Sequence, residues 1–591
     1  MLAHGKASLI IYLKFIKMVR LVLQIVDVLP PQMVALLFPQ TCRRTPRRRL
    51  WRSTLTAITF CCLVSLADAK HGRGRGNGNG QKLTDGVAAR FLIQSTFGPN
   101  SQLVAQVEKK GIAAFLDQQF TVPATATLPL VDQSVAGLPT GTGPSNPQFQ
   151  EAWWRTIVTA PDQLRQRVAF ALSEIMVISA NGNGMSEHPE AMAVYWDLLA
   201  QDAFGNFRQL IEDVTLNPAM GDFLDMVHND KPNARRNTEP NENYARELMQ
   251  LFTIGLYRLN PDGSQQLDPN KKPIPTYDQD VVEGYAHLFT GWYWAQTGTP
   301  TWNYVPANYR QPMIAFPENH DLGAKTLLNG MTLPAGLTQA EDLKDGLDLL
   351  FNHPNTAPFI SRRLIQRLVT SNPTPGYISR ISRVFANNGH GVRGDLKAVV
   401  RAILLDSEAR SNAFADDAGY GHEREPVIRL ANLYRAFNAA APSGKFVVNN
   451  QSFNFGQAPL YSPTVFNFFA PDYAQPGAIE QAGLVAPEFQ ITTDTTVITS
   501  ANRMRNAVYQ QPSATNLDAI VLDFSSLIPL TSNPALLVDS LDNLLMGGAM
   551  SPEMRTIVIT AVTKIPAAST FERAQTAVHL IVTSPEFVIQ E

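Results

Sequence analysis

Residues 238–255 read TEPNENYARELMQLFTIG, and this stretch decides the fold class. At about 100° per residue, its apolar side chains fall on one side of a helix and its polar side chains on the other. Pro240 suits the first turn of a helix, and Gly255 suits the left-handed residue that ends one. The stretch therefore predicts an amphipathic helix over residues 241–254 with both ends marked.

The polar side of this helix has the composition of a functional site. It carries no Lys and groups two carboxylates, two carboxamides and a guanidinium: Glu242, Asn243, Arg246, Glu247 and Gln250. Two carboxylates in different environments can divide general acid and general base work. We take Glu242, Glu247 and Arg246 as candidate catalytic residues, and Asn243 and Gln250 as candidate ligand-binding residues. The alternative is structural, because Glu242 and Arg246 have the four-residue spacing of a helical ion pair.

The first 69 residues have the features of an export leader rather than of a fold. An arginine-rich segment at 43–52 precedes a short apolar segment at 55–66 and small residues that suit a cleavage site. The arginines also fit a twin-arginine signal, and the sequence leaves this route and the general pathway open. Met33 is a better start than the upstream codon. The leader predicts a protein exported to the periplasm or the cell exterior, and residues 70–83 predict a Gly-rich linker.

Removal of the leader changes the charge and the cysteine content. The leader holds ten of the 49 Lys and Arg residues and two of the 51 Asp and Glu residues, which leaves a formal net charge of −10. A nucleic-acid partner is not expected, because a phosphate-binding surface needs excess cation. Cys42, Cys61 and Cys62 all lie in the leader, so the mature chain has no disulfide and no thiolate site. No later stretch is long and apolar enough for a membrane span.

Residues 84–591 predict a mainly α fold: a large multi-helix globular domain with long ordered loops and at most minor β structure. Apolar residues recur at helical spacing along most of this chain, for example at 104–120. The best β-branched runs are 445–448 and 557–565, and the second can also be helical. The aromatic, proline-rich segment 461–476 predicts an ordered loop. The length leaves one lobe or two open.

Histidines provide candidate metal ligands without a metal motif. None of the eight His residues after residue 84 falls in a His-x-x-x-His or His-Glu-x-x-His array. His287 lies four residues after Glu283 on an expected helix, and His320 precedes Asp321. We take His287 and His320 as candidate ligands of a divalent metal such as calcium or zinc, in a site assembled from distant segments. The chain has no phosphate-binding loop and no dinucleotide fingerprint, so no nucleotide cofactor is expected.

Aromatic and arginine residues are further candidates for a ligand site. Trp292 and Trp294 lie near an expected loop and can stack on the sugar rings of a glycan, although a core position is the commoner fate of Trp. Arginines are frequent in or beside apolar helices, where they commonly form ion pairs between helices. The alternative is a cationic pocket for a sulfated or carboxylated glycan. These arginines are Arg165, Arg167, Arg362, Arg363, Arg367, Arg393, Arg410 and Arg424.

Seven short sequence motifs follow one another along the chain. They are RFLIQSTFG at 90–98, LRQRVAFALS at 164–173, NENYARE at 241–247, FTGW at 289–292, HPN at 353–355, REP at 424–426 and SPEF at 584–587. In this order they resemble the bacterial family called domain of unknown function 1800. The resemblance covers about residues 84–590. It implies an exported, mostly helical protein, often encoded beside a second exported protein similar to the alkaline phosphatase and sulfatase group, and it implies no activity or catalytic residue.

Two functions fit these observations, and the sequence leaves open whether the protein is an enzyme. The first is a cell-envelope enzyme or enzyme partner that uses the polar helix face. The second is a non-catalytic binding or scaffold protein that docks the phosphatase- or sulfatase-like partner through residues 461–476. Geometry separates them, because an active site needs a ligand-accessible face, whereas a structural face is closed by arginines from neighbouring helices.

Overall fold

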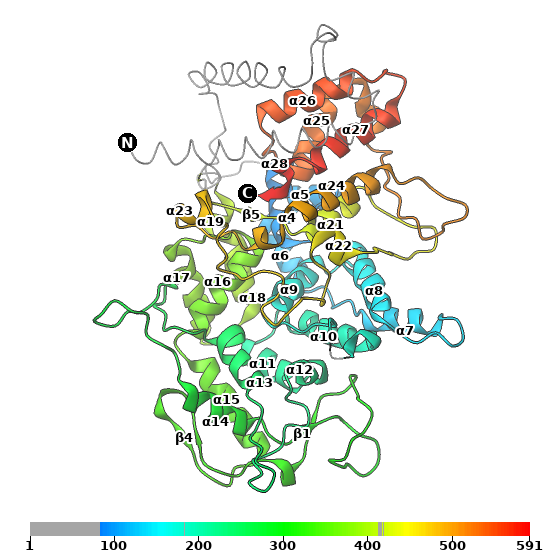
Figure 1. The fold of residues 1–591 in the computed structure, drawn as a ribbon. Helices are drawn as coiled ribbons and strands as arrows, with labels where there is room; N and C mark the ends of the chain where they lie inside the picture. The colour runs from blue at the N-terminus through cyan, green and yellow to red at the C-terminus, as the bar shows by residue number, and fades with distance from the viewer. Residues whose placement is uncertain (1–82, 183, 412–416, 418) are drawn as a thin grey trace, which may run out of the picture.

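The computed structural model describes residues 83–591 apart from residue 183, residues 412–416 and residue 418. The expected leader, the three cysteines and all but the last residue of the expected linker lie outside the described residues. Within the described part, the fold is mainly α, as the sequence predicts, and its strands form three two-stranded sheets (Figure 1).

Helices run through the whole described chain. The first group is α4 (Asp85–Ser95), α5 (Ser101–Lys110), α6 (Ile112–Gln119), α7 (Leu128–Ala136), α8 (Asn146–Thr159), α9 (Gln163–Ser173), α10 (Pro189–Asp202), α11 (Phe207–Leu216), α12 (Pro218–Phe223), α13 (Asn243–Glu247), α14 (Gln279–Leu288), α15 (Gln339–Asn352) and α16 (Thr356–Leu368). The second group is α17 (Pro375–Ala386), α18 (Leu396–Leu405), α19 (Ser407–Arg410), α21 (Pro426–Ala436), α22 (Gln451–Phe455), α23 (Ala478–Gln481), α24 (Asp494–Tyr509), α25 (Pro534–Leu541), α26 (Pro552–Thr563), α27 (Thr570–Val582) and α28 (Pro585–Val588). Two π-helical segments occur at Leu248–Thr253 and Asp542–Met546.

The strands are two residues long and pair antiparallel. The pairs are β1 (Trp292–Tyr293) with β2 (Ile314–Ala315), β3 (Lys325–Thr326) with β4 (Thr332–Leu333), and β5 (His422–Glu423) with β6 (Ile589–Gln590). The third pair joins the end of the chain to the segment before α21. The β content is therefore minor and closes connections between helices rather than forming a layer.

Two predicted elements differ in the structure. The helix expected over 104–120 is two helices, because Gly111 between α5 and α6 has a φ of 83°. This value lies outside the helical region and is open mainly to glycine. Residues 445–448 form no strand, whereas the second β-branched run belongs to α26 as far as Thr563.

The largest buried side chains gather where α8, α9 and α10 pack together. Trp153, Trp154 and Trp196 are fully buried. The Trp153 ring makes edge contacts with Trp154 and Trp196, at 5.3 and 5.5 Å between ring centroids. Figure 1 places these helices in the middle of the molecule, with α25–α28 at one end and α13–α15, β1 and β4 at the other. The polar helix face thus lies in the half of the molecule away from the C-terminal helices.

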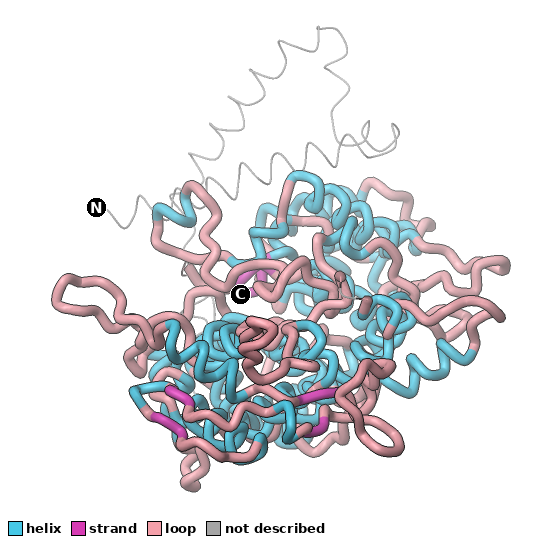
Figure 2. Tube along the Cα trace, turned by 60° about the horizontal axis from the view of Figure 1, so that its bottom comes forward, coloured by secondary structure: helices cyan, strands magenta, loops and turns pink. Residues whose placement is uncertain are grey.

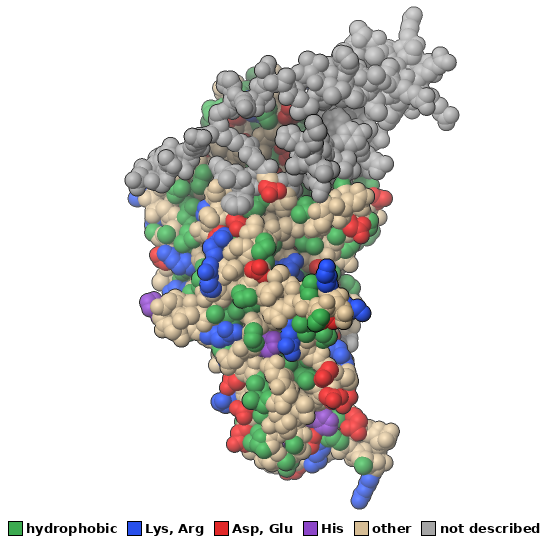
Figure 3. All heavy atoms as spheres, turned by 90° about the vertical axis from the view of Figure 1, so that its left-hand side faces the viewer, with side chains coloured by type: hydrophobic (Ala, Val, Ile, Leu, Met, Phe, Trp, Pro, Cys, Tyr) green, Lys and Arg blue, Asp and Glu red, His purple; other side chains and the backbone are tan. Residues whose placement is uncertain are grey.

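Long loops cover much of the surface between the helices (Figure 2). On the face shown in Figure 3, acidic and basic side chains are interspersed. No helix of the described residues is long and apolar enough to cross a membrane.

Candidate functional site

The predicted amphipathic helix is present, and its second half is π-helical. α13 ends at Glu247, and the π-helical segment Leu248–Thr253 follows directly. The Ile254 N–H donates to the Met249 carbonyl at 3.1 Å, the five-residue spacing of a π turn. Gly255 ends the helix with a φ of 73°, as predicted. Single π turns inside α-helices occur frequently at functional sites.

The polar face is connected to α14 by side-chain hydrogen bonds. Arg246 donates to Glu242 at 2.7 Å and to Gln279 at 3.2 Å. Gln279 donates in turn to Glu242 at 3.0 Å and to Glu283 at 3.3 Å. The predicted ion pair is therefore present, and the Gln279 amide of the neighbouring helix contacts both of its members and also Glu283. The side chains of Arg246 and Glu242 are 41% and 32% exposed, so a ligand can reach this network.

The loop before α13 supports the same face with a strained backbone. Asn243 donates to the Asp225 carboxylate at 2.6 Å, and Asp225 itself has a φ of 57°. His228, three residues later, has a φ of 60°, and its ring lies 4.6 Å from Tyr293 and 4.5 Å from Trp302. Left-handed backbone is uncommon outside glycine and clusters at ligand and active sites. Asp and His enter this region more readily than most residues, and the Asp225 carboxylate contacts the polar face through its hydrogen bond from Asn243.

Glu247 is the half-buried carboxyl of the polar face. Its Oε2 is buried and has no hydrogen-bond partner among the described residues, and the same is true of the Tyr277 hydroxyl. Burial raises the pKa of Glu247, and the positive charge of Arg246 opposes this rise. Burial raises the pKa of Tyr277 to about 12, with Arg246 opposing and Glu247 adding to the rise. Such an environment is one that tunes general acids and bases.

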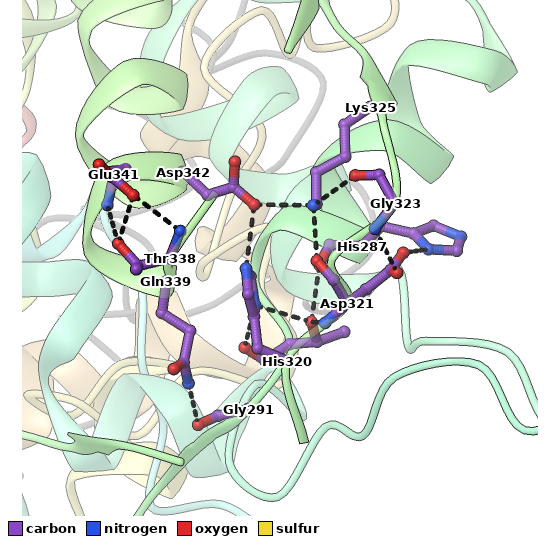
Figure 4. A network of polar contacts seen from close by, with 11 residues as sticks. His287, Gly291, His320, Asp321, Gly323, Lys325, Thr338, Gln339, Glu341 and Asp342 are labelled. Carbon is purple, nitrogen blue, oxygen red and sulfur yellow. Dashed lines mark hydrogen bonds and ion pairs between the residues drawn. The ribbon is translucent and has the colours of Figure 1, made fainter. Parts of the chain in front are cut away.

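His287 lies at the end of α14 and is paired with Asp321 (Figure 4). Its Nδ1 is 2.5 Å from Asp321 Oδ2, and the two side chains are 28% and 20% exposed. Burial opposes ionisation of Asp321, but hydrogen bonds from Gly323 and His287 and the charge of Lys325 keep the pKa of Asp321 below its ordinary value. The arrangement holds the imidazole in one orientation at the surface.

His320 belongs to a buried network beside this pair (Figure 4). Its Nε2 lies 3.0 Å from Asp342, which also pairs with Lys325 at 2.7 Å. Its Nδ1 lies 3.2 Å from the Thr290 hydroxyl. The two predicted metal ligands therefore have different partners. The part of the chain that the structure describes contains no group of three or more His, Cys, Asp or Glu side chains that could hold a metal ion.

The predicted sugar-stacking residues lie inside the protein. Trp292 and Trp294 are each 6% exposed, and Trp294 makes an edge contact with Tyr309 at 5.2 Å. Trp302 packs against Phe316 at 5.3 Å. Protein atoms cover most of both predicted rings, so stacking on a glycan requires movement of this cluster. Gln250 is half-buried in the π-helical segment.

The arginines connect segments of the core through carbonyls as well as carboxylates. Arg165, Arg393 and Arg424 donate to backbone carbonyls of other segments. Arg367 forms an ion pair with Glu174, 3.6 Å away. The expected set of ion pairs is therefore only part of what these arginines do.

A buried charge cluster in the middle of the molecule contains two of these arginines, Arg167 and Arg367, and the sequence analysis missed its members Glu174 and Gln457. Glu174 follows α9 and Glu425 precedes α21, and the Gln457 amide donates to both carboxylates. Arg167 is fully buried beside them. Burial and the Glu174 carboxylate raise the pKa of Glu425 well above its ordinary value, and Arg367 and Arg167 oppose this rise. A cavity of about 10 Å³, room for about one water molecule, adjoins Glu174 and Gln457. The cluster is thus closed to a larger ligand.

The family model described as "Protein of unknown function (DUF1800)" matches residues 90–589. The chain belongs to the DUF1800 family. The resemblance carried by the short strings is confirmed. No curated protein and no solved structure matches the chain.

Three of the strings that indicated the DUF1800 family map to two places in the fold. The string at 241–247 forms the polar face. The strings at 164–173 and 424–426 bring Arg167 and Glu425 into the buried cluster. The signal for that cluster in the sequence was a carboxylate at the end of an arginine-containing helix, but its partner lies about 250 residues away along the chain.

Proposed function

We propose that the protein is an exported acid–base enzyme, or the catalytic partner of a second exported enzyme, with its site on the polar face of α13. The observation that supports this proposal is the Glu247 carboxyl. It is half-buried, has a raised pKa and an unpartnered oxygen, and lies beside an exposed network that a ligand can reach. Unpaired buried polar groups destabilise a fold, so their retention favours a functional role.

The other residues of the face have distinct roles in this proposal. Glu247 donates or accepts a proton at the reacting group. Arg246 binds an anionic or polar group of the substrate, and Glu242 and Gln279 hold its guanidinium in place. Asn243, fixed by Asp225, contributes the adjacent polar contact. A non-nucleotide envelope component such as a glycan has the polar groups that this face can bind.

The test is a comparison of Glu247→Gln with wild-type protein purified through its own export route. Candidate substrates are chromogenic glycosides, esters, sulfates and phosphates, assayed alone and with the neighbouring exported protein. Glu239→Gln is the matched control, because Glu239 is an exposed carboxylate in the same segment. We expect loss of activity in Glu247→Gln alone. Full activity in that variant would exclude the acid–base role.

A scaffold function is the second candidate, supported by the exposed aromatic ring of Phe466. This residue is 52% exposed within the 461–476 loop, whereas Phe469 in the same loop is 1% exposed and packs over Arg367. The Phe466 ring is accessible to a partner on an anchored loop, although single exposed apolar side chains are common on protein surfaces. Co-purification of the phosphatase- or sulfatase-like protein, lost on Phe466→Ser, supports this function, and no co-purification at low salt contradicts it.

A further inference from the structure

His287 has one ring nitrogen committed and the other without a hydrogen bond to the described residues. The committed nitrogen, Nδ1, pairs with Asp321 Oδ2 at 2.5 Å, and the other oxygen of this carboxylate accepts the Gly323 N–H at 2.9 Å. An ionised carboxylate only accepts, so Nδ1 carries the proton in the neutral imidazole. In this tautomer Nε2 carries a free lone pair, and the His287 side chain is 28% exposed.

Asp321 is fixed from three sides, so the imidazole is positioned and does not swing freely. The Asp321 N–H donates to the Thr290 hydroxyl at 2.9 Å, and Gly323 N–H donates to Asp321 Oδ1 at 2.9 Å. The Lys325 ammonium, which is buried, donates to the Asp321 carbonyl at 2.7 Å. Figure 4 shows Asp321, Gly323 and Lys325 on the same side of the His287 imidazole. A carboxylate that orients a histidine in this way is a recurring part of acid–base sites.

His287 also continues the polar surface that begins on α13. Gln279, Glu283 and His287 are separated by four residues on α14, so they lie on successive turns of one face. A rise of about 1.5 Å per residue places His287 about 6 Å from Glu283 and about 12 Å from Gln279 along the axis. Because Gln279 and Glu283 are hydrogen-bonded partners of the α13 network, His287 lies at the far end of the same surface.

We propose that His287 is a general base for a water molecule that attacks an extended, polar, ester-linked substrate lying along α14; this inference rests on the proposed function of the neighbouring polar face. Nε2 accepts a proton from water while the water oxygen bonds to the acyl carbon. The bond from that carbon to the leaving oxygen breaks, and the proton passes from Nε2 to the leaving alcohol. Asp321 is a positioning residue that holds the tautomer.

The neighbouring His320 shows why the inference applies to one histidine only. His320 is also paired with an aspartate, but it is 1% exposed and both of its ring nitrogens face protein partners. Asp342 is further committed to Lys325. His320 therefore stabilises the loop that carries Asp321, whereas His287 has the exposure and the free nitrogen that proton transfer from water requires.

The first experiment measures the tautomer and reactivity of His287 without any natural substrate. In protein with isotope-labelled histidine, nuclear magnetic resonance should show the proton on Nδ1 of neutral His287, and Asp321→Asn should abolish this preference. Modification by diethyl pyrocarbonate, mapped by mass spectrometry, should be several-fold faster at His287 than at His390, an exposed histidine on a separate loop. A proton on Nε2, or a rate at His287 no faster than at His390, would overturn the proposal.

The second experiment uses para-nitrophenyl acetate as an activated ester. His287→Gln should lower kcat about 10²-fold, and Asp321→Asn should lower kcat by a similar factor with KM unchanged. His390→Gln should hydrolyse the ester at the wild-type rate, and circular dichroism should confirm that all variants are folded. An unchanged rate in His287→Gln contradicts the proposal. If Glu247→Gln is fully active while His287→Gln is not, the role of Glu247 fails and that of His287 stands.

Discussion

For the single residue Glu247, a substitution should affect stability and activity differently. Burial raises the pKa of this carboxyl, so the ionised form is disfavoured in the folded protein and the fold loses stability as pH rises above the ordinary glutamate range. An amide of the same shape has no such penalty. We therefore expect Glu247→Gln to keep or raise the melting temperature while lowering activity about 10²- to 10⁴-fold. A fall of several degrees in the melting temperature, measured by calorimetry, would instead assign Glu247 a structural role.

The buried carboxyl pair of Glu174 and Glu425 gives a second prediction, which concerns stability alone. Burial and the Glu174 carboxylate raise the pKa of Glu425 well above its ordinary value, which favours the neutral carboxyl, and Gln is a close mimic of that neutral form. Glu425→Gln should change the free energy of unfolding by no more than about 1 kcal/mol. The double variant Glu174→Gln with Glu425→Gln removes two carboxyl groups that face Arg167 and Arg367 and leaves Glu488, and its free energy of unfolding should fall by about 3–5 kcal/mol.

Urea unfolding at neutral pH measures both values. The single and double variants share the Glu425 substitution, so the difference between them isolates Glu174 once Glu425 is neutral. Equal stability of the two would mean that Glu174 does not compensate the arginine charges.

Local pairs of residues could be predicted from the sequence, and distant pairs could not. The four-residue spacing of Glu242 and Arg246 predicts their ion pair, because helix geometry fixes which side chains meet. His287 and Asp321 are separated by a long loop that contains β1 and β2, and nothing in spacing selects Asp321 as the partner. Adjacent residues need not share a side-chain partner either, since His320 pairs with Asp342 whereas Asp321 pairs with His287.

At the element scale, the end of the α13 segment depends on one glycine. Gly255 has a φ of 73°, and a Cβ there would lie 2.8 Å from the Phe359 ring. Gly141 has a φ of 85° with nothing within 4 Å, so it is a control for the backbone term alone. We expect Gly141→Ala to lower the free energy of unfolding by about 1–2 kcal/mol. Gly255→Ala should lower it by about 1–3 kcal/mol more through overpacking.

Chemical denaturation of both variants checks the Gly255 prediction. If the two substitutions lower the free energy of unfolding equally, the Phe359 ring moves aside and its contact with the new Cβ does not destabilise the fold. If Gly255→Ala also lowers activity while Gly141→Ala does not, the end of the π-helical segment positions the polar face.

The same segment shows how far element boundaries follow from sequence. Gly255 marks the end of the helix correctly, because it acts through local backbone geometry. Pro240 lies before the first turn rather than in it, because the helix begins at Asn243. The π turn is absent from the sequence signal, since the apolar pattern is equally compatible with an α-helix over 241–254. In contrast, Gly111 divides a stretch whose apolar pattern is continuous, so one residue with a positive φ overrides periodicity.

At the scale of the whole molecule, the fold class followed from periodicity, but the arrangement of the helices did not. β6 at the end of the chain pairs with β5, and Gln590 donates to the Leu368 carbonyl at 3.0 Å. Contacts between segments more than 160 residues apart leave no mark on local spacing. The charge cluster around Glu174 is assembled by the same long-range packing, and therefore its effect is a property of the whole fold.

The pH dependence of stability tests that global property through Glu488. Burial raises the pKa of Glu488 to about 8, against the opposing charge of Arg367. Between the ordinary glutamate value and pH 8, the folded protein holds a proton that the unfolded chain has lost, so stability falls as pH rises by about 1.4 kcal/mol per pH unit for this group. The buried His422, whose pKa is lowered to about 4, acts in the opposite direction, but only below the ordinary histidine range. The free energies of unfolding of wild type and Glu488→Gln, compared by urea denaturation from about pH 6.5 to pH 8, should therefore diverge in favour of the variant as pH rises. If the free energies of unfolding of the two proteins changed in parallel with pH, Glu488 would be ionised in the folded protein. The positive charge of Arg367 would then outweigh the effect of burial on this carboxyl.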